Sequence, residues 1–369
     1  MTKLALYIHI PFCLKKCAYC DFNSVPLKSQ DTSRRYIQRL LGEIRQHGET
    51  HAQGRIVDTI YFGGGTPSLL APRDIRDTLT AVQQCFTVGA RPEITIEGNP
   101  GTVTRDKLRG YTDCGVTRLS LGSQSFIDSE LKLLGRVHTA KDICTAYEAA
   151  REAGFRNISL DLIFGLPAQH SEDLSYSLGE ILRLAPEHVS TYSLTIEKGT
   201  LLARMVAAKK LPYPDQDTQA HMFRTIEKTL SGNGYTQYEI SNFAKKGYES
   251  RHNQAYWTGK DYIGFGAGAH SYLDGVRYAN TKDAVCYIER NRVKRFGKLS
   301  DDERFRERIV LGLRMLKGIA IGKHAASRSN LQTRIQPLID DGLLEYRKGI
   351  LKLTDTGVFF YDTVAVELL

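Results

Sequence analysis

The chain has 369 residues, of which 41% are hydrophobic and 25% charged, with a formal net charge of +9. This composition is typical of a soluble globular protein with one large domain plus a smaller one, or two domains of medium size. It excludes a membrane-spanning start, because the apolar run LALYIHI is shorter than the roughly 20 residues that cross a bilayer and no secretory cleavage pattern follows it. Seven cysteines, an odd and unevenly spread number, exclude a secreted disulfide scaffold. We therefore expect a cytoplasmic protein whose positive charge suits anionic partners.

Six short segments rich in β-branched and aromatic residues predict strands in the first two-thirds of the chain. They are LALYIHI (4–10), VDTIYF (57–62), EITIEG (93–98), TRLSLG (117–122), NISLDLIFG (157–165) and HVSTYSLTI (188–196). Apolar residues at helical spacing predict helices over 32–47, 72–86, 139–154 and 171–186, with Thr139, Ser171 and Gly154 at positions where caps belong. Alternating strands and helices predict a parallel sheet with right-handed crossovers, either open or curled into a barrel.

Residues suited to chemistry follow the ends of these strands. Three cysteines come after the first strand, and GGGTP (63–67) comes after the second. The third strand ends near Glu97 and Asn99, Gln124 follows the fourth, and GLP (165–167) follows the fifth. Because the carboxyl ends of parallel strands meet at one edge of a sheet or barrel, we expect one shared site at one rim.

The strand–helix repeat stops near residue 200, and a different pattern begins near residue 300. Two helix candidates, DDERFRERIVLGLRML and LQTRIQPLIDDG, are followed by LLEYRKGILKLTDTG, which has two β-type runs around a Lys–Gly turn. Helices followed by a hairpin indicate a winged-helix-like module, which serves either as a DNA-binding unit or as a lid or interaction domain. Acidic pairs such as Asp340–Asp341 interrupt this region, so we expect no nucleic-acid partner. Steeply salt-dependent DNA binding would contradict that expectation.

The spacing Cys13-x3-Cys17-x2-Cys20 is the sharpest signal in the sequence. One interpretation is a zinc site completed by a distant Cys, His or Asp. Zinc knuckles, however, usually pair two CxxC halves, and the other four cysteines of this chain stand alone. A cubane iron–sulfur cluster normally takes four thiolates, so three leave one iron open to an outside ligand. The pattern therefore favours a cluster with an open iron.

CxxxCxxC with an aromatic residue, here Tyr19, just before the last Cys resembles the signature of the radical S-adenosylmethionine (SAM) superfamily. The resemblance implies a [4Fe-4S] cluster on Cys13, Cys17 and Cys20, with SAM chelating the fourth iron through its amino and carboxylate groups. Reduction of such a cluster cleaves SAM to a 5′-deoxyadenosyl radical. The segment IYFGGGTPS is similar to the one that holds the SAM amino group in this superfamily, although a tight strand-to-helix turn would also explain its glycines.

Nearly the whole chain resembles one branch of that superfamily, the anaerobic coproporphyrinogen III dehydrogenases and their relatives, the HemW heme chaperones. The matching stretches are YIHIPFC, YFGGGTPS, ITIEGNP, RLSLGSQSF, LGRVH, DLIFGLP and the winged-helix-like tail. The resemblance implies SAM contacts from Tyr7, Tyr19, Gly64, Gly65, Thr66, Glu97, Gln124, Arg136, Asp161, Thr195 and His270. Two of these residues have simpler alternative interpretations: Gln124 as a helix cap and Arg136 as a surface residue.

The sequence differs from that of the dehydrogenase at two places that bear on its reaction. The dehydrogenase resembles CxxxCxxCxC, whereas Phe22 occupies the position of the extra Cys here. Only twelve residues precede Cys13, while the dehydrogenase has an N-terminal extension. Both differences argue against porphyrinogen oxidation, so catalytic turnover stays open and the dehydrogenase activity is the alternative hypothesis.

HNQAYW (252–257) resembles the HNxxYW motif of the HemW proteins. His252 is a competent axial ligand for heme iron, and Tyr256 and Trp257 have rings that stack on a porphyrin. A histidine among aromatic residues is also commonly a hydrogen-bonded core residue, and both interpretations stay open. His9 and His138 are interpreted as structural. His270, in GFGAGAHS (264–271), is a candidate for the cavity near SAM by resemblance, since the spacing does not fit a dinucleotide-binding loop.

These observations predict a partial parallel (β/α)6 barrel with a C-terminal winged-helix-like α+β domain. We expect residues 1–200 to form the barrel, 201–299 a barrel-completing or linker region with the HNxxYW motif, and 300–369 the C-terminal domain. The resemblance implies a heme chaperone that holds a [4Fe-4S] cluster, SAM and heme, and that delivers heme to apo-hemoproteins such as membrane respiratory enzymes. A basic protein in the cytoplasm also suits peripheral association with the inner membrane.

Overall fold

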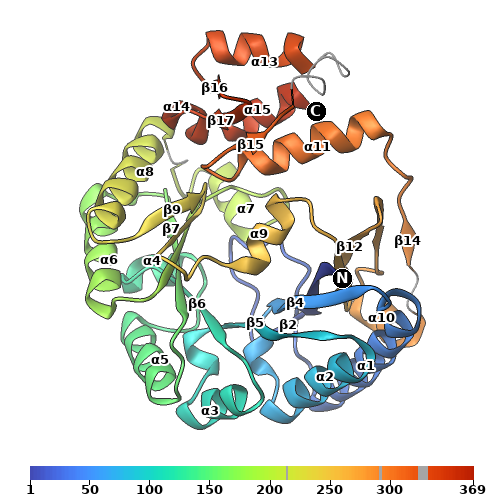
Figure 1. Cartoon of the computed structure of the whole chain (residues 1–369). Coiled ribbons are helices and arrows are strands. Elements are labelled where there is room, and N and C mark those ends of the chain that lie inside the picture. Colours follow the sequence, from blue (N-terminus) through green and yellow to red (C-terminus); the bar gives the residue numbers. More distant parts are fainter. Residues whose placement is uncertain (213–214, 291–292, 323–330) are drawn as a thin grey trace.

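One curved sheet dominates the structure. The computed structural model describes residues 1–212, 215–290, 293–322 and 331–369. Within these residues twelve strands pair in the order β14-β13-β12-β11-β1-β4-β5-β6-β7-β8-β10-β9 (Figure 1). The parallel strands are β1 (Thr2–Ile10), β4 (Arg55–Gly64), β5 (Val88–Gly98), β6 (Arg118–Gln124), β7 (Ile158–Phe164), β8 (His188–Ser193) and β11 (Tyr262–Phe265).

All six strands expected from the sequence are present, and their burial explains their composition. Every residue of β6 is buried, and β1 and β7 are buried over most of their length. A parallel strand covered on one face by helices and facing a filled interior on the other has no exposed face, so its sequence is rich in Val, Ile and Leu throughout. The predicted partial barrel is confirmed, and the sheet is open rather than closed because β14 and β9 do not pair with each other.

Helices cover the outer face of the curved sheet (Figure 1). No helix in the described ranges is long and apolar enough to cross a membrane. The helices of this layer and of the segments after it are α1 (Gln30–His51), α2 (Pro72–Cys85), α3 (Arg105–Asp113), α4 (Asp128–Leu133), α5 (Ala140–Glu152), α6 (Ser171–Leu184), α7 (Leu201–Ala207), α8 (Gln216–Ser231), α9 (Arg251–Trp257) and α10 (Ala284–Arg290).

Two of the three expected caps are where the sequence places them. Thr139 accepts from the backbone N–H of Asp142 and forms a capping box with it at the start of α5. Gly154, with φ +98°, ends the same helix in the left-handed conformation that glycine adopts without strain. Ser171 is wrong as a cap by one position, because His170 is the N-cap of α6 and the Asp173 carboxylate accepts from its backbone N–H.

The second half of the sheet was not expected in detail. Antiparallel strands extend it at both sides, and a small parallel pair holds the cysteine loop. These strands have two to four residues, too short for alternation of polar and apolar residues to identify them. They are β2 (Phe12–Cys13), β3 (Val25–Pro26), β9 (Thr236–Glu239), β10 (Asn242–Ala244), β12 (His270–Leu273), β13 (Val276–Ala279) and β14 (Lys294–Arg295).

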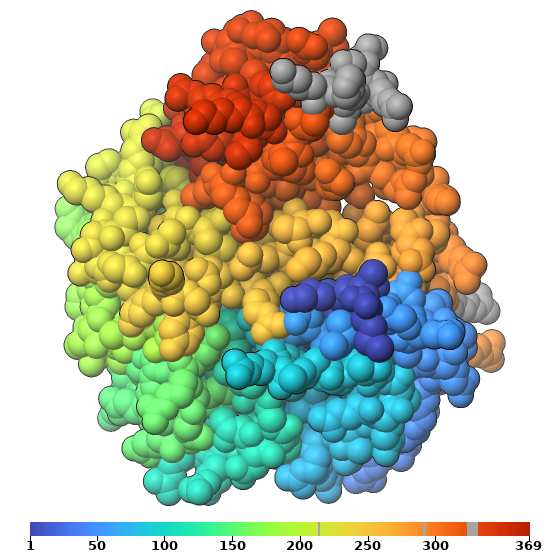
Figure 2. All heavy atoms as spheres, in the orientation of Figure 1, coloured from blue at the N-terminus to red at the C-terminus, as the bar shows by residue number. Residues whose placement is uncertain are grey.

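A small C-terminal unit with its own hydrophobic core sits on the barrel (Figure 2). Its β-hairpin turns at Lys348 and Gly349, both with positive φ, which is the geometry of a tight two-residue hairpin turn. Helices and a three-stranded antiparallel sheet thus form the winged-helix-like arrangement that the sequence predicts. Its elements are α11 (Asp301–Leu313), β15 (Ile319–Ala320), α13 (Leu331–Asp340), β16 (Leu344–Arg347), β17 (Ile350–Leu353), α14 (Asp355–Phe359) and α15 (Tyr361–Leu368).

Candidate functional site

A pocket of about 340 Å³ at the carboxyl ends of the parallel strands brings most of the expected site residues together. We call it the cysteine pocket. The parallel strands β1, β4, β5, β6, β7 and β8 each contribute at or just after their ends, as the topology of parallel sheets dictates. Of the sequence candidates, its lining includes Cys13, Cys17, Tyr19, Cys20, Gly64, Gly65, Thr66, Glu97, Gln124, Arg136, Asp161 and Thr195.

The cysteine loop between β1 and α1 is fixed by backbone hydrogen bonds. Pairing of β2 with β3 sets Cys13 opposite Pro26, and the Ala18 N–H donates to the carbonyl of Leu134 over 2.9 Å. Thr66 donates its hydroxyl to the Cys13 sulfur at 3.5 Å. Burial raises the pKa of the Cys13 and Cys20 thiols, so both favour the protonated form until a metal or a cation arrives.

Gly64 and Gly65 let the chain after β4 pass against the end of β1. Gly64 has φ +116°, and a Cβ there would lie 2.6 Å from the His9 ring. A Cβ on Gly65 would lie 2.7 Å from the carbonyl oxygen of Phe12, which is backbone and cannot move aside cheaply. The glycines are therefore required by chain packing, whatever they contact in a ligand.

Glu97 and Asp161 are partly shielded carboxylates on the inner face of the sheet. Tyr61 donates to Glu97 at 2.8 Å and the Gly64 N–H donates at 3.1 Å, while Ser120 donates to Asp161 at 3.1 Å. Burial raises the pKa of Glu97 to about 7 and that of Asp161 to about 6. Carboxylates whose ionisation is costly bind cationic or hydroxyl-bearing ligands well, because such a ligand supplies the missing partner.

Arg136 is a pocket residue and not the surface residue that was the alternative. Its guanidinium donates to the Gly122 carbonyl at 2.9 Å, to the Asn99 side chain, and to the Cys17 sulfur at 3.5 Å. This places a positive charge beside the Cys17 sulfur in the pocket. Gln124 has φ +67°, an uncommon backbone conformation for a residue other than glycine.

Tyr7 and His270 are separated from the other expected SAM contacts. They line a neighbouring cavity of about 400 Å³, which shares Phe22, Gly64 and Glu97 with the cysteine pocket. We call it the tyrosine chamber. Its wall comes from β1, from the loop after the cysteines, from α9, from β11 and from residues 268–270, and it also contains His9, Asn23, Tyr256, Tyr262, Gly268 and Ala269.

His252 is buried inside the barrel, with 1% of its surface exposed. Its Nδ1 is 2.9 Å from the Thr59 hydroxyl and its Nε2 is 3.0 Å from the Tyr256 hydroxyl, so both ring nitrogens are occupied. The ring stacks on Tyr61 with centroids 5.0 Å apart, and burial lowers the pKa of His252 to about 3. This placement favours the structural interpretation over an axial heme ligand. Tyr256, by contrast, lines the tyrosine chamber.

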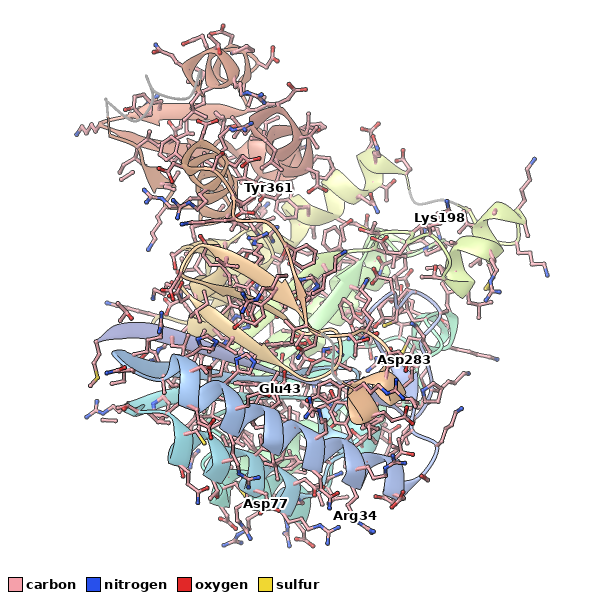
Figure 3. The ribbon with its side chains drawn as sticks, turned by 90° about the vertical axis from the view of Figure 1, so that its right-hand side faces the viewer. Arg34, Glu43, Asp77, Lys198, Asp283 and Tyr361 are labelled. Carbon is pink, nitrogen blue, oxygen red and sulfur yellow. The ribbon has the colours of Figure 1, made fainter. Side chains whose placement is uncertain are left out.

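Trp257 faces the C-terminal unit instead of an open cavity. The guanidinium carbon of Arg314 lies 4.3 Å from the centroid of the Trp257 ring and 5.1 Å from that of Tyr361. Arg314 also pairs at 3.3 Å with Glu239, which is fully buried. Figure 3 labels Tyr361 where the C-terminal unit meets the barrel. The Trp257 ring is thus covered by Arg314, which joins the two parts of the molecule.

Sequence reasoning missed several residues of this rim. Tyr192 and Ser120 line the cysteine pocket from β8 and β6, and Tyr61 holds Glu97. Alternation along β6, counted from Gln124, assigns Ser120 to the inner face, whereas no site residue predicted within β8 marks the face of Tyr192. Asn23, which donates to the carbonyls of Ala267 and Lys282 at 2.9 Å each, carries no such signal.

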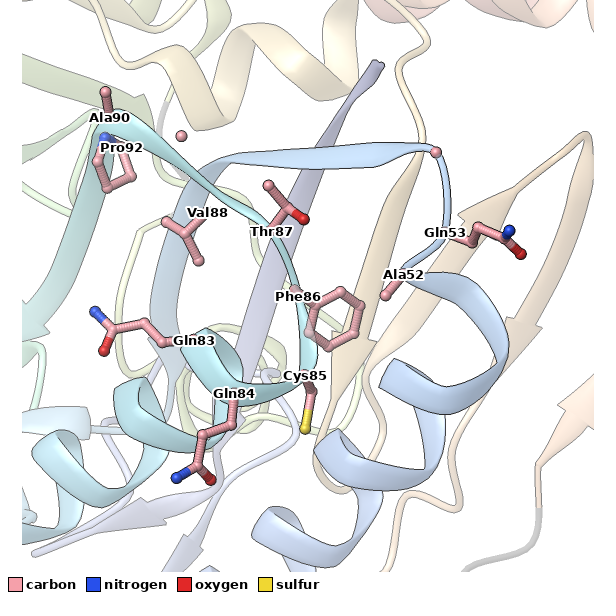
Figure 4. Close-up of a pocket in the computed structure, with 12 residues that line it drawn as sticks. Ala52, Gln53, Gln83, Gln84, Cys85, Phe86, Thr87, Val88, Ala90 and Pro92 are labelled. Atoms are coloured by element: carbon pink, nitrogen blue, oxygen red, sulfur yellow. The ribbon is translucent and has the colours of Figure 1, made fainter.

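A larger groove of about 830 Å³ lies away from this site (Figure 4). It is formed where α1 and α2 end and where β4 and β5 begin, which is the opposite end of the parallel strands from the cysteines. Glutamines and small residues line it, and Cys85 is the ionisable side chain among its described lining residues. We place the functional site at the cysteine rim because the titratable and metal-ligating groups gather there.

Comparison with known proteins assigns the class of this fold and site. The Radical SAM superfamily matches residues 7–179, and the HemN C-terminal domain matches residues 299–360. The solved structure of coproporphyrinogen III oxidase (HemN) from Escherichia coli superimposes with a TM-score of 0.85 at 24% identity, covering 100% of this chain and 90% of that one. The protein therefore has a radical SAM fold with a HemN-type C-terminal domain.

Full-length similarity narrows the class further. The chain is 36% identical to the heme chaperone HemW of Bacillus subtilis, over 96% of this chain and 94% of the relative. It is 43% identical to the heme chaperone HemW of Escherichia coli, over 76% of this chain and 74% of the relative. The chain belongs to the HemW family.

Proposed function

We propose that this protein binds heme and delivers it to apo-hemoproteins such as membrane respiratory enzymes. The observation that carries the proposal is the similarity to relatives named heme chaperone HemW, which extends over 96% of the chain and so includes the C-terminal unit. The net charge of +9 supports both an anionic cargo and contact with an anionic membrane surface, where respiratory enzymes reside.

We further propose that Cys13, Cys17 and Cys20 hold a [4Fe-4S] cluster and that SAM lies beside it in the cysteine pocket. The donor set fits, since three thiols line one pocket and the Arg136 guanidinium donates to the Cys17 sulfur. In a [4Fe-4S] cluster held by three cysteines, each of three irons takes one thiolate. When bound, such a cluster supplies one electron to SAM.

The chain's own residues then have defined tasks toward SAM. Glu97 and Asp161, which line the pocket, would accept hydrogen bonds from its amino or hydroxyl groups, and the loop at Gly64 and Gly65 would offer it backbone groups. Arg136, which donates to Asn99 and to the Gly122 carbonyl, would pair with the carboxylate of SAM. The raised pKa of Glu97, about 7, favours a ligand that brings positive charge.

Phe22 supports a chaperone over a dehydrogenase. It occupies the position of the extra Cys of the dehydrogenase motif, and 64% of the residue's surface is exposed at the border of the cysteine pocket and the tyrosine chamber. A large exposed apolar side chain at a pocket mouth suits contact with an apolar ligand.

The test is an anaerobic comparison of two activities in cluster-reconstituted protein with SAM and reductant. Heme-loaded protein is mixed with an apo-cytochrome, and heme transfer is followed by the absorption spectrum, with free heme at the same concentration as control. The same protein is incubated with coproporphyrinogen III, and products are analysed by mass spectrometry. We expect heme transfer without decarboxylated porphyrinogen. Failure to bind heme, or formation of protoporphyrinogen, would overturn the proposal.

A further inference from the structure

The tyrosine chamber has the size and walls of a site for a flat ligand. Its volume of about 400 Å³ lies within the range of small-molecule pockets. Tyr256 and Tyr262 meet edge to face with centroids 4.7 Å apart, and Tyr7 contributes a third phenol ring. Phe22 stands at the mouth with most of its surface exposed. Aromatic walls of this kind recognise an extended unsaturated ring system by stacking and edge contacts.

His270 differs from the other histidines near the site. His9 is held at Nδ1 by the Tyr7 hydroxyl over 3.1 Å and at Nε2 by the Asn23 carbonyl over 2.8 Å, and both nitrogens of His252 are likewise occupied. The His270 ring is exposed and makes no hydrogen bond with the described residues, although it lines the chamber. It stacks on Phe296 with centroids 6.0 Å apart at an angle of 12°. Its ring is thus oriented but chemically free.

The surroundings of His270 keep its ring neutral and supply cations for carboxylates. Burial together with Lys282 and Arg277 lowers the pKa of His270, so the imidazole is in the unprotonated form that ligates iron at neutral pH. The Lys282 carbonyl accepts from Asn23, which itself lines the chamber, and the Lys282 charge acts on the His270 ring, so this exposed lysine lies close to the chamber. A lysine at a rim forms charge-assisted hydrogen bonds with a carboxylate that reaches the surface.

We infer that heme binds in the tyrosine chamber, with the His270 imidazole on its iron, Phe22 against its ring and Lys282 at a propionate. The inference rests on the proposed function, since it names the site of the same cargo. It moves the heme ligand from His252, whose ring nitrogens are both bonded, to the free imidazole next to the cysteine pocket. Cargo and cofactor site are then neighbours that share Phe22, Gly64 and Glu97.

The experiment is ferric-heme titration of the full-length, cluster-loaded protein, with absorption difference spectra and electron paramagnetic resonance. The variants are His270→Ala and His270→Cys, and the matched control is His221→Ala, which removes an exposed histidine from α8 outside the chamber. We expect His270→Ala to weaken binding at least about tenfold and to lose the histidine-ligated spectrum. His270→Cys should convert that spectrum to a thiolate-ligated one, and His221→Ala should match the wild type.

Two outcomes would overturn this assignment, and each has a distinct meaning. Wild-type affinity and spectrum in both His270 variants would show that iron is ligated elsewhere while heme binding itself stands. No heme binding by the wild-type protein would overturn the proposed function, and the site assignment with it. Lys282→Glu provides an independent check, since charge reversal at a propionate contact should weaken heme binding and leave the iron spectrum unchanged.

Discussion

Removal of the Arg314 guanidinium is expected to loosen the C-terminal unit from the barrel. Glu239 is fully buried and Arg314 is 19% exposed, so Arg314→Ala leaves a buried carboxylate without its charged partner. Breaking such a pair costs about 3–5 kcal/mol, because the desolvation of the remaining charge is no longer offset. The stacking of Arg314 between Trp257 and Tyr361 is lost as well, at about 0.5–2 kcal/mol for each ring. We expect a loss of at least about 3 kcal/mol in the free energy of unfolding.

The loss in the free energy of unfolding caused by Arg314→Ala should also depend on pH, and the pKa of Glu239 gives the direction. Burial raises the pKa of Glu239 and Arg314 lowers it, so without Arg314 its pKa rises further above the value in the unfolded chain. A carboxyl whose pKa is raised by folding contributes its full stability below the unfolded pKa, about 4.3, and loses it as the pH rises through the folded pKa. Arg314→Ala should therefore be more damaging at pH 8 than at pH 5.

Urea unfolding followed by fluorescence measures this effect directly, because Trp257 is the single tryptophan of the chain and stacks on Arg314. Arg347→Ala is the control, since Arg347 is 84% exposed in its pair with Glu345 and should behave as wild type. The double variant Glu239→Gln, Arg314→Met should recover most of the loss by removing both charges. A loss below about 1 kcal/mol in Arg314→Ala, or one that does not change with pH, would refute this account of the joint.

Three further predictions concern the cysteine rim. Cys17→Ser should abolish reconstitution of the cluster, measured as iron and sulfide content, whereas Cys286→Ser at an exposed site should not; a full cluster in Cys17→Ser would remove that thiol from the ligands. Gly65→Ala should lower the midpoint of thermal unfolding, because its Cβ would meet backbone at 2.7 Å. Gly42→Ala, which has open space in α1, should instead raise the free energy of unfolding by about 0.5–1 kcal/mol. Equal effects of the two changes would contradict the packing argument. SAM affinity should rise with pH between about 6 and 7.5 as Glu97 ionises. The variant Glu97→Gln should bind SAM about tenfold more weakly and should not show that rise, whereas a pH profile like that of the wild type would exclude Glu97 as the titrating group.

Local pattern was sufficient to predict the parallel strands and the position of the rim. Each helical pattern, each β-rich segment and the cysteine spacing is contained within about twenty consecutive residues. The topology of parallel sheets then brings the strand ends together. The small strands β12 and β13 were missed because four residues carry too little pattern, although their pairing creates the wall on which His270 lies.

The surroundings of His252 and Trp257 could not be read from sequence, because both depend on contacts between distant segments. The Thr59 hydroxyl that occupies His252 Nδ1 lies 193 residues away along the chain. The motif HNQAYW presents the same residues whether its histidine is buried or exposed, and only packing decides which nitrogen is free. The same packing leaves His270 available, although nothing in GFGAGAHS distinguishes its ring from that of His252.

The two edges of the sheet determine how far the chain can be shortened without aggregation. In the described ranges β14 is only two residues long, and both are basic, which discourages pairing with another chain. The β9 edge is covered by the segment that follows α11, since Ile240 N–H donates to the Arg314 carbonyl at 3.2 Å and Leu316 N–H donates to the Tyr238 carbonyl at 3.2 Å. A fragment that ends before α11 would expose this edge as a template for strand addition between molecules. The C-terminal unit therefore also covers the β9 edge, and we expect expression of the barrel alone to need a charged substitution along β9.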